Sequence, residues 1–359
     1  MYEAKYICNS YFFWVMHMPS LMLKNATFRQ LAALHAVARL GSVSRAASEL
    51  NVTQPAVSIQ LKLLEESAGT PLLVRDGRGV RLSGAGELMA DYAARILDLW
   101  REAGDEMAAQ RGVFSGRLRV GAVTTAEYLL PPLLVAFAGR QPQIKVKLRV
   151  GNRDEIVQML ARRDIDLAIM GRPPAELQTT SAAFAKHPMA FLGAPSHPLM
   201  ARQGLKLADL QAANLLVRER GSGTRAALER MHKDADTPLR IGSELSSNEA
   251  IKQMCAAGLG VAFLSLHTCG LEMQAGLLAT LPMAGKPIER EWFVMHLASR
   301  RLAQVAAAFK TFLVDEGQGV ILEKLPLDIV MPAKAGIPSS SKPSQRAARK
   351  RPGFQPALE

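Results

Sequence analysis

Residues 44–65, SRAASELNVTQPAVSIQLKLLE, restrict the possible folds most strongly, because two short helical patterns lie only a tight turn apart. Ser44 is a candidate N-cap of the first pattern, and Thr53 is a candidate N-cap of the second. Pro55 is tolerated just inside the second pattern, since the first turn of a helix does not need its missing N–H. Together with a preceding helical pattern over residues 27–40, these features predict a helix-turn-helix.

The second helix of this pair has two faces of opposite character. One face is apolar, and the other is polar at a spacing of four residues. The apolar face comprises Val57, Leu61 and Leu64, and the polar face comprises Gln54, Ser58 and Lys62. A polar face is usually a solvated surface, so this spacing alone does not establish a contact with a ligand.

A basic hairpin is predicted to follow the helices, over PLLVRDGRGVRLS at residues 71–83. Helices followed by a basic hairpin are typical of a winged helix-turn-helix, which we place over residues 23–83. In this context the polar face of helix 53–65 is the surface expected to enter the major groove of double-stranded DNA.

Residues 84–112 predict a long linker helix with an apolar stripe. A stripe on a helix between two domains has to be covered, and a second copy of the chain covers it most economically, which predicts a homodimer. Packing against its own domain is the alternative, because the spacing does not distinguish the two. The stripe comprises Leu88, Tyr92, Ile96, either Leu99 or Trp100, Ala103 and Met107.

From residue 116 the pattern changes to alternating strands and helices, with a polar break near residues 172–186. Two blocks of similar size, closed by a final strand and helix, predict two α/β lobes with a cleft between them. We place this domain over residues 113–317, with lobe I at 116–184 and 287–317 and lobe II at 185–286. The fold class is therefore α+β multidomain.

The formal net charge of +12 and the pI near 9.8 predict a polyanionic partner. Part of this charge lies in residues 318–359, whose Pro, Ser, Lys and Arg content predicts a disordered basic tail. Residues 1–22 lack the organisation of a signal peptide, and we expect a non-essential extension there. No later stretch has the ~20 apolar residues of a membrane span, so we expect no membrane partner.

Patterns for catalysis and metal binding are absent from the sequence. Three scattered cysteines indicate a reducing cytoplasm rather than a disulfide framework, and Cys255 and Cys269 are expected to be buried structural thiols. The histidines lack metal-ligand spacing, and no dinucleotide, P-loop or serine-nucleophile motif occurs. We therefore expect no catalytic residue, no metal, no bound cofactor and no enzymatic activity.

Residues 28–87 closely resemble the DNA-binding domain of LysR-type transcriptional regulators. The GS-x-S-x-AA-x-x-L run, the TQPAVS helix start, the LE-x-x-x-G exit and the LS-x-x-G wing occur together and in order. The resemblance covers residues 24–316 and implies a two-lobed effector-binding domain of the periplasmic-binding-protein type. Five later stretches are most similar to the branch that controls the Calvin-cycle (RuBisCO) operon. They are TTAEYLLP, RVGNRDEI, DLAIMGRPP, RERGSGTR and SNEAIKQMCAAGLGVAFLS.

This resemblance implies a homotetramer built from dimers on an interrupted palindrome, usually as an activator that contacts RNA polymerase. It also implies a small-molecule effector, either a phosphorylated metabolite or a nicotinamide nucleotide.

On DNA, the N-terminal half of helix 53–65 is expected to face the bases. Gln54 suits adenine, Ser58 suits several base edges, and the apolar surface of Pro55 and Ala56 suits a thymine methyl. Lys62 is expected to reach phosphate or guanine, and the hairpin is expected to contact phosphates or the minor groove. Position 59, often basic in the family, is Ile. The candidate DNA-binding residues are Thr53, Gln54, Pro55, Ala56, Ser58, Lys62, Arg75, Arg78 and Arg81.

Three predicted helix starts of the two-lobed domain gather hydroxyl groups and backbone donors, which favour an anion. Each start alone is more typical of an ordinary N-cap, but three that face one cleft predict a small-anion site. Arg225 suits a phosphate, and Arg172 is either a second anion partner or a surface residue. The candidate effector-binding residues are Thr124, Thr125, Arg172, Ser222, Gly223, Thr224, Arg225, Ser247 and Asn248.

Two alternatives to a carbon-fixation regulator remain at this point. The first is a LysR-type regulator of another metabolic operon with a different effector. The second is a solute-binding protein with an N-terminal extension, which the two lobes alone would also fit. A solute receptor needs a signal peptide and no winged helix, so residues 27–83 distinguish the two classes.

Overall fold

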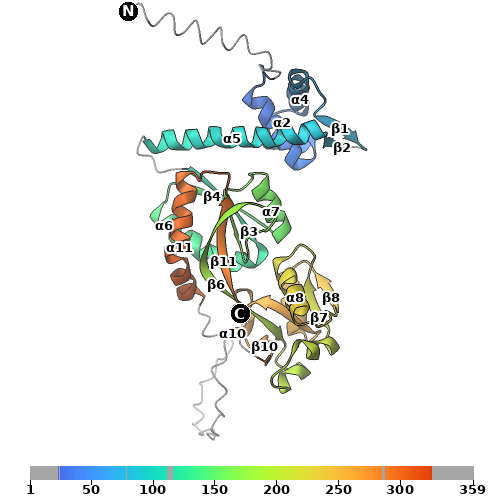
Figure 1. Ribbon diagram of the computed structural model, residues 1–359. Coiled ribbons are helices and arrows are strands. Elements are labelled where there is room, and N and C mark those ends of the chain that lie inside the picture. The colour runs from blue at the N-terminus through green and yellow to red at the C-terminus, as the bar shows by residue number, and fades with distance from the viewer. Residues whose placement is uncertain (1–22, 24, 78, 111–115, 285–287, 326–359) are drawn as a thin grey trace, which may run out of the picture.

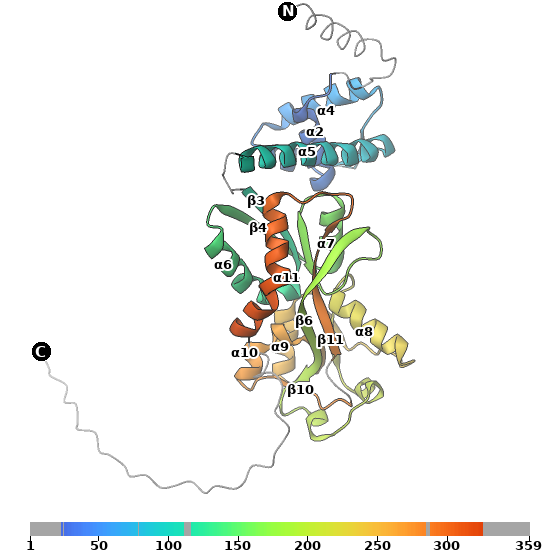
Figure 2. The ribbon, with the colours of Figure 1, turned by 60° about the vertical axis from the view of Figure 1, so that its left-hand side comes forward.

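The chain forms three parts in order: a small helical domain with a hairpin, a long helix and a two-lobed α/β domain (Figure 1). This computed structural model describes residues 23, 25–77, 79–110, 116–284 and 288–325. The long helix lies between the other two parts in both views (Figure 2). The predicted fold class is confirmed. Among the described residues, no helix is both long and apolar enough to span a membrane.

Three short helices and a hairpin build the N-terminal domain. They are α2 (Phe28–Leu40), α3 (Val43–Leu50), α4 (Gln54–Ala68), β1 (Leu73–Asp76) and β2 (Gly79–Leu82). Thr53 caps α4 by accepting the Ala56 backbone N–H. α3 begins earlier than predicted, because Ser42 rather than Ser44 caps it and accepts the Arg45 N–H.

The predicted apolar face of α4 forms the core of this domain. Val57, Leu61 and Leu64 are buried and pack with apolar residues of α2, among them Leu34. Burial of such side chains stabilises the fold by roughly 1.5–3 kcal/mol each, so the register of α4 is fixed and its polar face is held outward.

The long helix α5 (Gly84–Gln110) begins in close contact with the segment that joins α4 to the wing. A Cβ atom added at Gly86 would lie 1.9 Å from the Leu72 carbonyl oxygen, so only glycine allows this approach. Much of the predicted apolar stripe is exposed on this chain, and Leu99 keeps 64% of its surface accessible.

Lobe I contains three parallel strands with helices packed against them. Its elements are β3 (Gly116–Val123), η1 (Thr124–Tyr128), α6 (Leu130–Arg140), β4 (Ile144–Gly151), α7 (Arg153–Ala161) and β5 (Leu167–Met170). Lobe II holds the remaining short elements. These are η2 (Pro198–Ala201), η3 (Leu207–Ala212), β7 (Leu215–Arg218), α8 (Gly223–Asp234), β8 (Ser243–Leu245), α9 (Asn248–Ala256), β9 (Val261–Ser265), η4 (Leu266–Thr268), α10 (Gly270–Gln274) and β10 (Ala279–Thr280).

Two long antiparallel strands, β6 (Thr179–Gly193) and β11 (Ile288–Leu297), join the lobes. The resulting sheet has the order β4-β3-β5-β11-β6-β9-β7-β8, with β10 paired to β6. The predicted polar break at 172–186 was too long, because residues 179–186 already belong to β6. Their polar side chains occupy exposed positions of a strand that pairs with β11.

The last helix, α11 (Gln304–Lys324), covers lobe I and extends past the predicted domain end at residue 317. Residues 318–324 are therefore helical and do not belong to the predicted tail. The helix continues because Ile321 is fully buried, and because Gly317 lies against the Phe184 ring. The predicted tail beyond residue 325 and the extension at 1–22 lie outside the described residues.

Candidate DNA-binding surface and effector cavity

The polar face of α4 is exposed at the end of the molecule farthest from the two lobes (Figure 1). Thr53, Gln54, Pro55, Ser58 and Lys62 are exposed, and Ala56 is half-buried. Ser44 of α3 donates a hydrogen bond to Gln54 Oε1 at 3.0 Å, which holds the amide at the start of the helix. Ile59 is also exposed, so the face carries an apolar residue between its polar ones.

The wing presents its arginines on two sides. Arg75 pairs with Val80 in the hairpin register, and Arg81 pairs with Val74. Because directly paired residues share a face, Arg75 and Arg81 lie on opposite faces of the wing, and both are exposed. Arg78 lies outside the described residues.

A cavity of about 700 Å³ lies between the two lobes. Seven of the nine predicted effector-binding residues line it, and Ser247 and Asn248 do not. The lining residues among the nine are Thr124, Thr125, Arg172, Ser222, Gly223, Thr224 and Arg225. This size is within the range of small-molecule sites in proteins.

Arg218 was not predicted from the sequence. It occupies the side chain of Asn248, the first residue of α9, which does not line the cavity. Its guanidinium is buried, donates to Thr124 Oγ1 at 3.1 Å and also donates to Asn248 Oδ1. Thr124 in lobe I and Asn248 in lobe II are thereby joined across the lobes. Ser247 accepts the Ala250 backbone N–H and acts as an ordinary N-cap of α9.

The N-terminus of α8 lies at the wall of the cavity. Ser222 caps the helix by accepting the Thr224 N–H at 3.2 Å, and both residues line the cavity with Gly223. Gly221 turns the chain into the helix with φ at 85°, a backbone conformation that residues other than glycine rarely adopt. The free N–H groups of this first turn favour an anion.

Arg225 is held by partners of its own. Its guanidinium contacts Glu229 at 2.6 Å and Glu244 at 3.3 Å, and it donates to the Arg218 carbonyl oxygen at 3.2 Å. The residue is buried, so these contacts give it a structural function besides its place in the cavity wall. The contact with Glu244 could not be predicted from the sequence, because Glu244 comes from a separate strand, β8.

Four further arginines and one histidine line the cavity and were missed from the sequence. They are Arg153, Arg220, Arg230, Arg290 and His187. Three helix starts were considered from the sequence, and that of α7, where Arg153 lies, was not among them. Arg230 lies inside α8, Arg220 lies in a loop, and the last two side chains come from strands. Among the described residues, no cluster of three or more metal-ligating side chains occurs, so nothing there offers a metal site.

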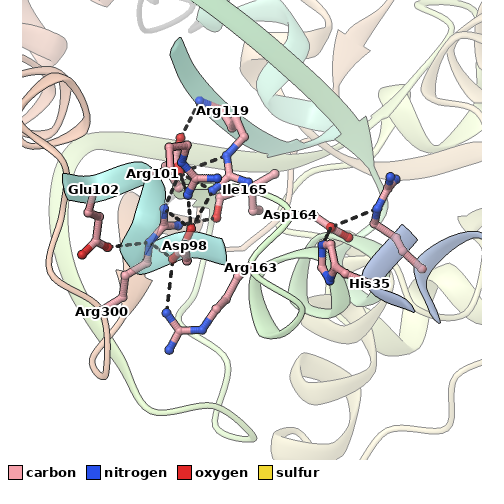
Figure 3. Close-up of polar contacts among 11 residues, drawn as sticks. His35, Asp98, Arg101, Glu102, Arg119, Arg163, Asp164, Ile165 and Arg300 are labelled. Atoms are coloured by element: carbon pink, nitrogen blue, oxygen red, sulfur yellow. Dashed lines mark hydrogen bonds and ion pairs between the residues drawn. The ribbon is translucent and has the colours of Figure 1, made fainter. Parts of the chain in front are cut away.

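A second polar cluster joins α5 to lobe I (Figure 3). Asp98 of α5 is buried and accepts from Arg300 Nη2 at 2.9 Å, while Arg119 and Arg163 each approach it to 3.3 Å. Burial opposes ionisation of neighbouring Asp166, but Arg119 and Arg300 hold its pKa below the usual value. The long helix is therefore attached to lobe I by buried charges.

The N-terminal domain also contacts lobe I directly. Arg39 Nε of α2 lies 3.2 Å from Asp164 Oδ1, and His35 Nε2 lies 3.7 Å from the same atom (Figure 3). Burial and nearby arginines lower the pKa of His35 to about 4, so its imidazole is neutral near pH 7 and this second contact is not an ion pair.

A winged helix-turn-helix joined through a long helix to a lobed domain with a cationic cavity defines a ligand-responsive DNA-binding protein. Family models agree with this class. The bacterial regulatory helix-turn-helix protein, lysR family, matches residues 28–87, and the LysR substrate binding domain matches residues 111–318. The chain belongs to the LysR family of transcriptional regulators, which confirms the predicted resemblance and is inconsistent with a solute-binding protein. The members of this family are regulators, in agreement with the expectation that the chain is not an enzyme.

Curated relatives lie in the expected branch. The chain is 40% identical over 82% of its length to the HTH-type transcriptional regulator CfxR of Cupriavidus necator, of which it covers 93%. It is 37% identical over 81% of its length to the RuBisCO operon transcriptional regulator of Allochromatium vinosum, of which it covers 97%.

One solved structure is similar to the two-lobed domain, and another is similar to most of the chain. The Synechocystis CcmR regulatory domain in complex with 2-PG is 34% identical, with a TM-score of 0.53 over 56% of this chain and 96% of that one. Full-length CbnR complexed with its target DNA is 27% identical, with a TM-score of 0.56 over 81% of this chain and 99% of that one.

Proposed function

We propose that this protein regulates transcription of a carbon-fixation operon, in the cytoplasm, in response to a small anionic metabolite. The observation that carries the proposal is the presence, in one chain, of an outward polar face on α4 and an arginine-lined cavity between two lobes. The relative named for the RuBisCO operon supports the choice of operon.

In this proposal the exposed residues of α4 read base edges. Gln54 has the amide that pairs bidentately with adenine, and Ser58 and Lys62 lie one and two turns further along the same face. Arg75 and Arg81 position the domain through phosphate contacts, since a flexible cation on a wing carries little sequence information. Contact with RNA polymerase, expected for an activator of this family, belongs to the same proposal.

The effector is a phosphorylated metabolite or a nicotinamide nucleotide. The first turn of α8 and Thr125 supply neutral donors to an anion, and the arginines supply opposite charge. The ligand 2-PG bound by the CcmR regulatory domain supports an anionic effector for this chain.

The helix α7 connects the cavity with the DNA-binding part. Its first residue, Arg153, lines the cavity, whereas Arg163 and Asp164 just beyond its end contact α5 and α2. A ligand that shifts α7 therefore changes the contacts of both helices, and this shifts the population of DNA-binding-domain orientations.

The exposed apolar stripe of α5 is covered by a second copy of the chain, and two such dimers form the homotetramer. Leu88, Leu99 and Trp100 are each more than half exposed on one chain, which is unfavourable for large apolar side chains gathered on one helix. A paired α5 places two winged domains on the two halves of a palindromic site.

Transcript levels of the RuBisCO operon test the proposal in a strain that lacks this gene. We expect the transcript to fall during autotrophic growth, to recover with the natural gene and not to recover with Gln54→Ala. Transcript levels that do not depend on the gene would contradict the operon assignment.

A further inference from the structure

The arginines of the cavity fall into two groups by their counter-charges. Arg153, Arg218 and Arg225 each lie within 3.5 Å of a carboxylate oxygen, on Glu176, Glu219 and Glu229 respectively. Among the described residues, no carboxylate oxygen lies within ion-pair distance of Arg172, Arg220, Arg230 or Arg290. The first group is neutralised within the protein, and the second is available to a ligand.

Three of the unneutralised guanidinium groups gather at one end of the cavity. Arg290 donates to the Gly171 carbonyl oxygen at 3.0 Å, and its other contact is the Met189 sulfur at 3.9 Å, so neither partner is charged. Burial and the nearby charges of Arg230 and Arg172 lower the pKa of Arg290 to about 10. A partly buried cation among like charges is unfavourable until an anion joins it.

His187 adds an unsatisfied polar group to the same end. Its ring is 3% exposed, lines the cavity and stacks on Trp292 at 3.8 Å between centroids. Neither ring nitrogen has a hydrogen-bond partner in the described part of the chain. Buried polar atoms in native proteins are nearly always hydrogen-bonded, so this imidazole lacks a partner that a ligand or water would supply.

This cationic end lies some distance from the first turn of α8. Arg230 follows Gly223 by seven residues on that helix, which places them about 10 Å apart along its axis at 1.5 Å per residue. Arg220 precedes the helix and adds its charge at the other end. The cavity thus has two positively charged ends separated by two helical turns.

We propose that Arg172, Arg230, Arg290 and His187 form a second anion subsite, so that the cavity selects metabolites with an anionic group at each end. One group binds the first turn of α8, and the other binds between the three guanidinium groups. The inference rests on the proposed function, because it requires the cavity to bind the effector.

Calorimetric titration of the full-length chain with α,ω-alkanediol bisphosphates of three to seven carbons, and with the matching alkyl monophosphates, tests the subsite. We expect one bisphosphate to bind at least about tenfold more tightly than its monophosphate, as for a second charged contact made within one ligand. Arg172→Met with Arg230→Met should abolish that advantage, so that the bisphosphate binds no more tightly than the monophosphate. Both side chains are exposed, so the double variant should fold.

Lys233→Met is the matched control, because it removes an exposed positive charge from α8 outside the cavity. It should retain the bisphosphate advantage. Fluorescence of Trp292, measured in the Trp14→Phe/Trp100→Phe background that leaves it as the sole tryptophan, gives a second readout, since His187 stacks on this indole.

If each bisphosphate binds no more tightly than its monophosphate, the second subsite is wrong and the effector cavity stands. If the double variant weakens both ligands equally, or Lys233→Met abolishes the advantage too, the arginines act only as general charge and the inference also fails. If neither ligand binds, both the inference and the proposed effector cavity are contradicted.

Discussion

The side chain of Gln54 is positioned by contacts from two neighbouring helices. It stands exposed at the start of α4, and Ser44 of α3 binds its Oε1 at 3.0 Å. The spacing of polar residues in the sequence was sufficient to select this face, because burial of Val57, Leu61 and Leu64 leaves no other orientation for the helix.

Replacing Gln54 with Ala is expected to cost ~1–3 kcal/mol of binding to the cognate site, since a bidentate base contact is lost. Binding to random DNA should change little. The control Arg81→Ala should weaken both DNAs alike and lower the slope of log K against log salt by about one. Fluorescence anisotropy over a salt series measures both effects, and equal losses of Gln54→Ala on the two DNAs would refute base readout.

His267 makes lobe II sensitive to acid. Its Nδ1 accepts the Trp292 Nε1–H at 3.3 Å, so protonation there would break this hydrogen bond. Burial lowers the pKa of His267 to about 4, whereas an unfolded chain titrates near 6.5. As the pH falls from about 6.5 to 4, the unfolded chain binds a proton that the folded chain does not, so stability decreases across this window.

His267→Gln keeps a hydrogen-bond acceptor but does not titrate. Between pH 6.5 and 4, the natural chain should lose up to about 3 kcal/mol more unfolding free energy than the variant. Urea unfolding followed by Trp292 fluorescence in the Trp14→Phe/Trp100→Phe background measures this difference, and parallel pH profiles would contradict the assignment.

Some helices and strands could be predicted from sequence patterns, and others could not. Caps and apolar faces depend on neighbours within one helix, so α2, α4 and the wing were predictable. The end of α11 was not, because Gly317 looks like a helix terminator, whereas its small size fits it against Phe184 from a distant strand. The contact of Arg225 with Glu244 and that of Arg218 with Thr124 likewise join elements that only the fold brings together.

The start of α5 offers a test of a close approach between elements. Gly86→Ala should destabilise the DNA-binding domain by ~1–3 kcal/mol, because its Cβ meets the Leu72 carbonyl oxygen and the backbone has to move. Gly84→Ala is the matched control, since nothing lies within 4 Å of its added Cβ. Chemical denaturation compares the two, and similar stabilities would show that α5 adjusts freely.

For the whole molecule, the buried charges between α5 and lobe I are the main connection. Asp98→Ala leaves Arg300 buried without one of its three carboxylate partners, which should cost ~3–5 kcal/mol of unfolding free energy. The exposed pair Arg140–Glu316 is the control, and Glu316→Gln should change the unfolding free energy far less, because water screens this pair. Equal effects in thermal or urea unfolding would show that α5 is not held by this cluster.

Under the proposed function, a ligand in the cavity changes how the winged domains hold DNA. A DNase I footprint of the full-length chain on the DNA upstream of the RuBisCO operon tests this coupling, with and without a saturating phosphorylated metabolite whose binding is confirmed by calorimetry. We expect a protected site in both cases, and a change in its extent or in the concentration needed for protection when the ligand is bound. Identical footprints with the ligand demonstrably bound would contradict it.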